Sequence, residues 1–382
     1  MAFTQAAPFW VYLYAGFALF AYQTLDACDG KHARRTGMSS PVGQLFDHGC
    51  DALHCVLGVW TLSSCLLLGG LWDNYSYLIL AVGAQLVFWF STWEEYHTHV
   101  LFLPVINGPT EGLLLAQFLY IYTGLFGTDM WLQPAGDTLS ILNNIEVLQP
   151  LAELQLNLLF VVVTAVLVVA SCLGSIFNVF TKLRKEADKK RQLQRAGARG
   201  KNMKKKNDSK NDGNVSSVHR PLEAMSFVQA CEQHLSLFLF YGLFLFWIYI
   251  SPQQILLNAP YLVGFVLLFF SCLETMRMIV AYVTCSPYQG WWWLSLPLIL
   301  CLANAHPEII IDELDAGPMF DEYQFLWIMI MWVGGLYIYY VNEIFEELTY
   351  HLEIYMFICG HWKRPKRNVR EKKDQNVLTK LF

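Results

Sequence analysis

The sequence predicts an all-α polytopic membrane protein, and three observations support this fold class. Of the 382 residues, 55% are hydrophobic and only 15% are charged, which is too apolar for a soluble domain of ordinary composition. Apolar runs of roughly 18 to 25 residues, the length that a helix needs to span a bilayer, recur along the chain. Lysine and arginine are confined to a few segments. We therefore expect about nine transmembrane helices.

These predicted helices are the apolar runs taken in chain order. They lie near residues 8–26, 46–70, 76–95, 110–130, 157–180, 234–251, 260–283, 290–306 and 323–345. The run at 290–306 is the weakest, because Pro297 would kink a helix there. Membrane helices tolerate such a kink where neighbouring helices satisfy the freed backbone carbonyl, so we retain this helix in the prediction.

The positive charges predict the orientation, because cytoplasmic loops carry the excess of lysine and arginine. Lys31, Arg34 and Arg35 lie in the first predicted loop, a basic run at 182–220 follows the fifth helix, and another follows the ninth. No lysine or arginine lies in the opposite loops, near 71–75, 131–156, 252–259 and 307–322. We expect the basic segments on the cytoplasmic side and residue 1 in the lumen.

The basic run at 182–220 is low in apolar residues and rich in lysine and asparagine. This composition predicts a solvated cytoplasmic loop that is partly disordered and anchors the topology. Contact with anionic lipid at the membrane surface is the alternative.

Four aspartates lie where the first two apolar runs meet the polar segment between them. Asp26 and Asp29 are three residues apart at the end of the first run, and Asp47 and Asp51 are four apart at the start of the second. Each pair therefore shares a helix face. Four converging carboxylates repel one another unless cations lie between them, and hard divalent cations take oxygen ligands. The spacing predicts a two-metal site, with a buried salt-bridge network as the less favoured alternative.

This segment resembles the signature of the CDP-alcohol phosphotransferases and matches each of its positions. The matching residues are Asp26, Asp29, Gly30, Ala33, Arg34, Gly43, Asp47 and Asp51. Eight fixed positions are a far more specific signal than a lone glycine-rich loop. Four segments of this sequence resemble the eukaryotic choline and ethanolamine phosphotransferases in their fungal and plant forms. They are YQTLDACDGKHARRTG, LFDHGCDA, STWEEYHTH and NGPTEG. The resemblance is dense over 8–112 and continues beyond as a hydropathy pattern.

The resemblance implies the fold and the reaction of that family. The reaction transfers phosphocholine or phosphoethanolamine from CDP-choline or CDP-ethanolamine to diacylglycerol and releases CMP. Two Mg²⁺ ions, with Mn²⁺ as an alternative, are implied on Asp26, Asp29, Asp47 and Asp51. The implied substrate-binding residues are Gly30, Ala33, Arg34 and Gly43, because small side chains admit the nucleotide and a guanidinium fork suits phosphate oxygens.

The resemblance also implies how the chain is organised in the cell. We expect a homodimer in the endoplasmic reticulum or Golgi membrane with a cytoplasmic active site. The expected parts are a catalytic membrane domain at 1–180, a basic cytoplasmic loop at 181–225, C-terminal membrane helices at 226–345 and a cytoplasmic tail at 346–382.

Deprotonation of the lipid hydroxyl requires a general base. The resemblance to the eukaryotic branch implies that His48 is this base and that Glu111 orients its imidazole. The alternative makes Asp51 the base and leaves His48 as a helix-packing residue. Trp93 and Tyr96 have two interpretations, an aromatic wall for a quaternary ammonium group and, as the favoured one, belt aromatics at the membrane interface.

The sequence departs from the family at two places. Gln44 replaces the usual glutamate, from which we expect weaker electrostatic tuning of the site. Family members carry a further N-terminal segment with an interfacial helix and a first membrane helix, giving ten helices instead of nine. Because this segment is absent from the sequence, we expect a truncated gene model or isoform.

Two other functions remain open. A transferase that uses CDP-diacylglycerol and a soluble alcohol, such as a phosphatidylinositol synthase, shares the same signature. A non-enzymatic transporter or an inactive truncated paralogue is the other alternative, against which the intact aspartates argue.

Overall fold

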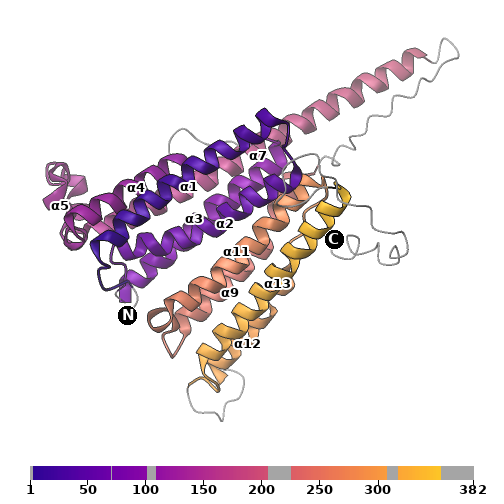
Figure 1. The fold of residues 1–382 in the computed structure, drawn as a ribbon. Coiled ribbons are helices and arrows are strands. Elements are labelled where there is room, and N and C mark those ends of the chain that lie inside the picture. Colours follow the sequence, from indigo (N-terminus) through magenta and orange to yellow (C-terminus); the bar gives the residue numbers. More distant parts are fainter. Residues whose placement is uncertain (1–2, 70, 101–108, 205–224, 308–316, 354–382) are drawn as a thin grey trace.

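The long helices of this chain form one bundle in the computed structural model, which describes residues 3–69, 71–100, 109–204, 225–307 and 317–353 (Figure 1). No strand occurs within these ranges, so the all-α class is confirmed. Each of the nine predicted helices coincides with a helix of the structure. They are α1 (Phe9–Thr36), α2 (Pro41–Cys65), α3 (Leu71–Thr98), α4 (Pro109–Phe126), α7 (Leu156–Lys204), α9 (Leu235–Ile250), α11 (Pro260–Val283), α12 (Leu296–Ala305) and α13 (Glu322–His351).

The remaining elements are short and connect the long helices. Between α4 and α7 lie η1 (Asp129–Leu132), α5 (Ala135–Thr138), η2 (Ser140–Leu142), η3 (Glu146–Leu148) and α6 (Gln149–Ala152). The others are α8 (Phe227–Glu232), α10 (Ile255–Asn258) and η4 (Trp292–Ser295).

Five helical segments of the described chain are long and apolar enough to cross a membrane. These segments lie in α3, α7, α8 with α9, α11 and α13. Helices α1 and α2 carry the charged residues of the aspartate segment, and α4 and α12 are only 18 and 10 residues long. The protein is therefore a multi-pass membrane protein.

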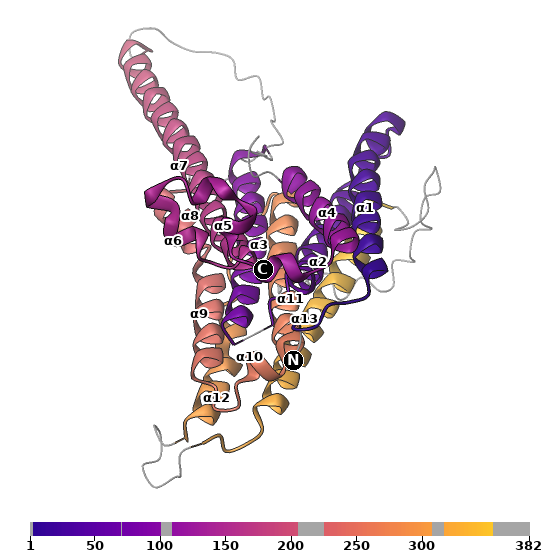
Figure 2. The same ribbon diagram turned by 90° about the vertical axis from the view of Figure 1, so that its left-hand side faces the viewer.

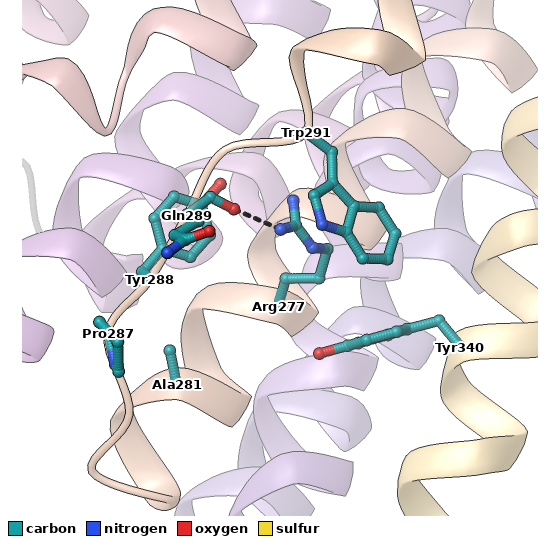
Figure 3. Close-up of a pocket in the computed structure, with 7 residues that line it drawn as sticks. All are labelled: Arg277, Ala281, Pro287, Tyr288, Gln289, Trp291 and Tyr340. Atoms are coloured by element: carbon teal, nitrogen blue, oxygen red, sulfur yellow. Dashed lines mark hydrogen bonds between the residues drawn. The ribbon is translucent and has the colours of Figure 1, made fainter. Parts of the chain in front are cut away.

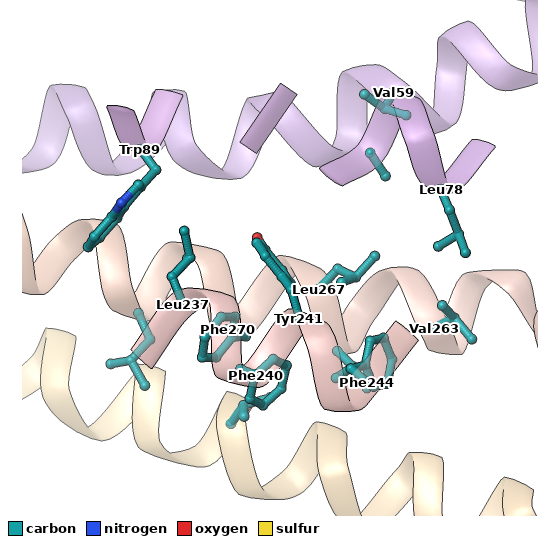
Figure 4. Packing of buried hydrophobic residues seen from close by; sticks show 14 of the residues in the cluster. Val59, Leu78, Trp89, Leu237, Phe240, Tyr241, Phe244, Val263, Leu267 and Phe270 are labelled. Atoms are coloured by element: carbon teal, nitrogen blue, oxygen red, sulfur yellow. The ribbon is translucent and has the colours of Figure 1, made fainter. Parts of the chain in front are cut away.

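Helix α11 occupies the centre of the bundle and packs against α2, α3 and α13. Of its 24 residues, 18 are buried. In the view of Figure 1, α1 to α4 and α7 lie on one side of α11, and α9, α12 and α13 lie on the other. Phe240 of α9 stacks on Phe270 of α11 with ring centroids 3.6 Å apart, in the middle of a continuous apolar core (Figure 4). The C-terminal half of the protein thus packs against α2 through α11 and α13.

The turn between α1 and α2 is specified by local sequence. Helix α1 ends at Gly37, whose φ of 68° lies in the left-handed region that favours glycine. Ser40 then caps α2, because its hydroxyl accepts a hydrogen bond from the amide of Gly43 at 3.1 Å, and Pro41 takes the first helical position. A reversal of four residues, 37–40, therefore brings the end of α1 beside the start of α2.

One prediction about the basic segments is wrong. Helix α1 continues to Thr36, so Lys31, Arg34 and Arg35 lie on the helix and not in a loop. Arg34 and Arg35 occupy its last turn, where positive charge is favourable beside the negative end of the helix dipole. Most of the polar segment between the first two predicted helices is therefore helical.

The predicted basic loop also begins as helix, because α7 continues through Lys204 (Figure 1). Its sequence after residue 180 is rich in lysine and arginine and also contains alanine and glutamine, all of which favour helix even without a packing partner. Lys182 and Glu186 pair one turn apart at 3.4 Å. In both views α7 extends beyond the other helices (Figures 1 and 2). Residues 205–224 of the loop and 354–382 of the tail lie outside the described ranges.

Candidate active site

The aspartates meet between the end of α1 and the start of α2. Asp26, Asp47 and Asp51 each contribute a carboxylate oxygen to a group in which all three atoms lie within 4.8 Å of one another. All three side chains are half-buried. The i, i+4 spacing on α2 places Asp47 and Asp51 on one face, and the turn at Gly37 directs the end of α1 toward that face.

Asp29 lies outside this group and is exposed, one turn further along α1. It remains close enough to add negative charge at Asp47. The structure therefore brings three of the four predicted metal ligands together and leaves the fourth at the rim.

The donor set fits a hard divalent cation. It consists of carboxylate oxygens alone, which is the chemistry that Mg²⁺ and Mn²⁺ prefer. The ion pairs found among the described residues are Lys182–Glu186, Asp188–Arg191 and Glu274–Arg277, none of which involves the aspartate group. The described residues therefore offer no support for the alternative of a salt-bridge network at these aspartates.

The predicted substrate-binding residues lie on the outer part of the same two helices. The guanidinium of Arg34 folds back over Gly30, since a Cβ on Gly30 would lie 3.4 Å from Arg34 Nη1. Arg34 and Gly43 are exposed, whereas Gly30 and Ala33 are half-exposed. These residues form an open rim around the carboxylates. Their contact with substrate stays a prediction.

Tyr22 forms the deep end of the site, and the sequence reasoning missed it. Its hydroxyl donates a hydrogen bond to Asp51 Oδ1 at 2.5 Å. Its ring stacks on the imidazole of His54, with centroids 4.4 Å apart and an interplanar angle of 20°. The available signal was its position four residues before Asp26, which places both on one face of α1.

His48 lies on α2 next to the carboxylates and is half-buried. Its electrostatic neighbours are Asp51 and Glu95, and the latter is a buried carboxylate near the end of α3. Glu111 is exposed in the first turn of α4. Among the described residues, no hydrogen bond or ion pair joins His48 to Glu111, so their pairing stays a prediction.

The belt interpretation of Trp93 and Tyr96 is wrong. Trp93 is fully buried and donates its indole N–H to Gln233 Oε1 at 2.9 Å. Tyr96, only 2% exposed, donates to the carbonyl of Ser286 at 3.1 Å. Both side chains therefore join α3 to the C-terminal half of the protein.

A second polar cluster lies at the C-terminal end of α11 and in the loop that follows it. Arg277 donates to Glu274 Oε1 at 3.0 Å and to the carbonyl of Gln289, and it lies 3.7 Å from the ring centroid of Trp291 (Figure 3). Tyr288 donates its hydroxyl to Glu274, and burial raises the pKa of Tyr288 well above its ordinary value, so it remains a donor. The adjoining cavity measures about 20 Å³, the space of one water. This cluster holds the loop after α11 in place.

The fold and the carboxylate group together define a polytopic membrane protein with an oxygen-donor site at the junction of two helices. The chain belongs to the CDP-alcohol phosphatidyltransferase family, whose family model matches residues 2–177.

Three relatives illustrate the similarity. Choline/ethanolaminephosphotransferase 1 of Arabidopsis thaliana is 31% identical over 356 residues, which cover 92% of this chain and 79% of the relative. Cholinephosphotransferase 1 of Saccharomyces cerevisiae is 28% identical over 369 residues, or 94% and 81% of the two chains. An uncharacterized class-I family protein of Dictyostelium discoideum is 50% identical over 125 residues, or 32% and 31%. The chain is thus a phosphotransferase enzyme of this family.

Proposed function

We propose that this enzyme transfers phosphocholine, phosphoethanolamine or both from the CDP-alcohol to diacylglycerol. The observation that carries the proposal is the convergence of Asp26, Asp47 and Asp51 in a relative of choline and ethanolamine phosphotransferases. A new bond forms between the diacylglycerol oxygen and the phosphorus that bears the headgroup. The pyrophosphate bond to that phosphorus breaks, and CMP leaves with the bonding electrons.

Asp26, Asp47 and Asp51 are the proposed metal ligands, with Asp29 as the outer one. Two Mg²⁺ ions, or Mn²⁺ in their place, would neutralise the pyrophosphate and stabilise the leaving phosphate when bound. The position of Asp29 at the rim supports a second ion further from Asp51.

The rim residues bind the nucleotide in this proposal. Arg34 directs a planar guanidinium toward phosphate oxygens, which it can hold in a bidentate manner. Gly30, Ala33 and Gly43 leave room for the nucleotide near the backbone. The folding of Arg34 over Gly30 supports this arrangement, because a Cβ at residue 30 would already be in van der Waals contact with the guanidinium.

His48 is the proposed general base, and it takes the proton of the diacylglycerol hydroxyl. Glu111 orients it, and the packing of α4 on α1 supports this role. Gln117 donates to Gln23 at 2.5 Å across these antiparallel helices. Glu111 precedes Gln117 by six residues on α4, and Asp29 follows Gln23 by six residues on α1. Because the two helices are antiparallel, Glu111 is expected beside Asp29, at the end of α1 that carries the site.

The cellular arrangement follows from the charge pattern. We propose a cytoplasmic active site in the endoplasmic reticulum or Golgi membrane, because the basic ends of α1 and α7 lie on the aspartate side. Residues 1–180 form the proposed catalytic domain, 226–345 the supporting helices, and 181–225 and 346–382 the cytoplasmic loop and tail. The homodimer stays a prediction.

The test is transfer by membranes from cells that lack their own activity and express this chain. Labelled CDP-choline and CDP-ethanolamine are supplied separately with diacylglycerol, and labelled inositol is supplied with CDP-diacylglycerol. We expect label in phosphatidylcholine, phosphatidylethanolamine or both, and none with the Asp47→Asn variant. Label only in phosphatidylinositol would show the alternative transferase, and no product from any donor would contradict the proposal.

A further inference from the structure

Tyr22 controls how Asp51 presents its two oxygens. Asp51 Oδ1 accepts the phenol hydrogen bond at 2.5 Å, so this oxygen already has a partner from α1. A carboxylate can otherwise rotate and offer either one or both oxygens to a cation. The hydrogen bond favours a single rotamer, in which the second oxygen remains free for the site.

The phenol is itself held from two directions. The stacking of its ring on His54, at 4.4 Å and 20°, fixes the plane of the ring against α2. The next residue, Gln23, is bonded to Gln117 of α4 at 2.5 Å, which fixes the rotation of α1 about its axis. Neither contact involves a carboxylate of the site, so Tyr22 is oriented independently of any bound ion.

We propose that Tyr22 is a positioning residue that orients Asp51 for divalent-cation binding. The inference rests on the proposed function, since it assigns Asp51 to the metal site. Hydrogen-bond partners of metal ligands orient those ligands, and their loss typically costs roughly 10- to 100-fold in metal affinity or activity. The tyrosine acts through Asp51 and does not itself touch the substrate.

The experiment compares two Tyr→Phe variants of the full chain, purified in nanodiscs. Tyr22→Phe removes one hydroxyl and keeps the ring that stacks on His54. Tyr12→Phe is the matched control, because Tyr12 lies on the same helix, is buried, and donates to the carbonyl of Ser64 at 3.3 Å. Mn²⁺ binding is measured without any CDP-alcohol, from the electron paramagnetic resonance signal of free Mn²⁺, and thermal unfolding is recorded for each variant.

We expect Tyr22→Phe to weaken Mn²⁺ binding roughly tenfold or more, whereas Tyr12→Phe binds as the wild type does. In transfer assays the Mg²⁺ concentration for half-maximal rate should rise by a similar factor, with the rate largely restored at saturating Mg²⁺. A purely structural role would lower the unfolding temperature and leave these metal affinities unchanged, and that result would overturn the inference.

Asp51→Asn separates this inference from the proposed function. If Asp51→Asn loses Mn²⁺ binding while Tyr22→Phe keeps it, the positioning role is wrong and the metal site stands. If Asp51→Asn binds Mn²⁺ as tightly as the wild type, the metal site itself is wrong, and the role of Tyr22 is rejected with it.

Discussion

Gly49 of α2 lies directly against Met276 of α11, so that a Cβ on Gly49 would come within 3.0 Å of the Met276 sulfur. Gly49 separates His48 from Cys50 on the turn that carries Asp47 and Asp51. The central helix of the C-terminal half therefore determines how closely the aspartate segment can approach the core. Packing far from the signature thus contributes to the geometry of the site.

The first prediction concerns this contact. Gly49→Leu should destabilise the protein by roughly 1–3 kcal/mol, because the added side chain overpacks the interface with Met276. Adding Met276→Ala should restore part of that loss by making room. The measurement is the thermal unfolding of purified protein, together with transfer activity. Equal destabilisation by the single and the double variant would show that Met276 is not the obstacle.

The second prediction concerns the carboxylates. Asp26→Asn or Asp47→Ala should lower transfer at least 100-fold at saturating Mg²⁺, since removal of one ligand from a group of three disrupts cation binding. Expression and membrane insertion should remain normal, because these side chains are only half-buried. Chelation by EDTA should likewise abolish transfer by the wild type, and added Mg²⁺ should restore it. Wild-type rates after chelation would exclude a metal-dependent reaction.

The third prediction compares two ion pairs. Glu274→Gln should destabilise the protein by about 3–5 kcal/mol, because Arg277, with a side chain only 7% exposed, would lose its counter-charge. Glu186→Gln breaks the Lys182–Glu186 pair, whose side chains are 39% and 47% exposed, and should cost less than about 1 kcal/mol. Urea or thermal unfolding in matched detergent measures both variants. Similar losses for the two would contradict the structural role assigned to Glu274.

The fold was largely predictable, because a bilayer imposes helices of a minimum apolar length. The course of α7 beyond residue 180 was not. Its charged residues carry no burial pattern, and only intrinsic helix propensity indicates the continuation. Trp93 and Tyr96 were misplaced for a related reason. In a membrane protein an apolar face can contact lipid or another helix equally well, so hydrophobicity does not predict which residues are buried.

The meeting of Asp26 with Asp47 and Asp51 was predictable from spacing, because the aspartates follow the helical period on helices that are adjacent in sequence, whereas Asp29 was expected in the group and lies outside it. The partner of Asp51 was not predictable, since Tyr22 is 29 residues away and the hydrogen bond depends on the rotation of α1 against α2. The exposure of Asp29 depends on the same rotation. Periodicity identifies a face of each helix, and only packing determines which residues of two faces meet.

The last prediction concerns the general base. His48→Ala should lower turnover roughly 100-fold or more, because the hydroxyl of diacylglycerol would lose its proton acceptor. CDP-alcohol binding should persist, since the carboxylates and Arg34 carry it. If Glu111 orients His48, Glu111→Gln should cause a smaller loss, and the double variant should be little worse than His48→Ala alone, because the two residues act as a unit.

Glu95→Gln provides the internal comparison, because the structure places the Glu95 carboxylate near His48 and Glu95 is not a proposed metal ligand. If Glu95→Gln is non-additive with His48→Ala while Glu111→Gln is additive, then Glu95 orients the imidazole and the role of Glu111 is wrong. A different result would exclude His48 as the general base. If His48→Ala keeps near-normal turnover while Asp51→Asn retains metal and CDP binding but loses chemistry, then Asp51 is the base, and the oxygen that does not accept from Tyr22 takes the proton.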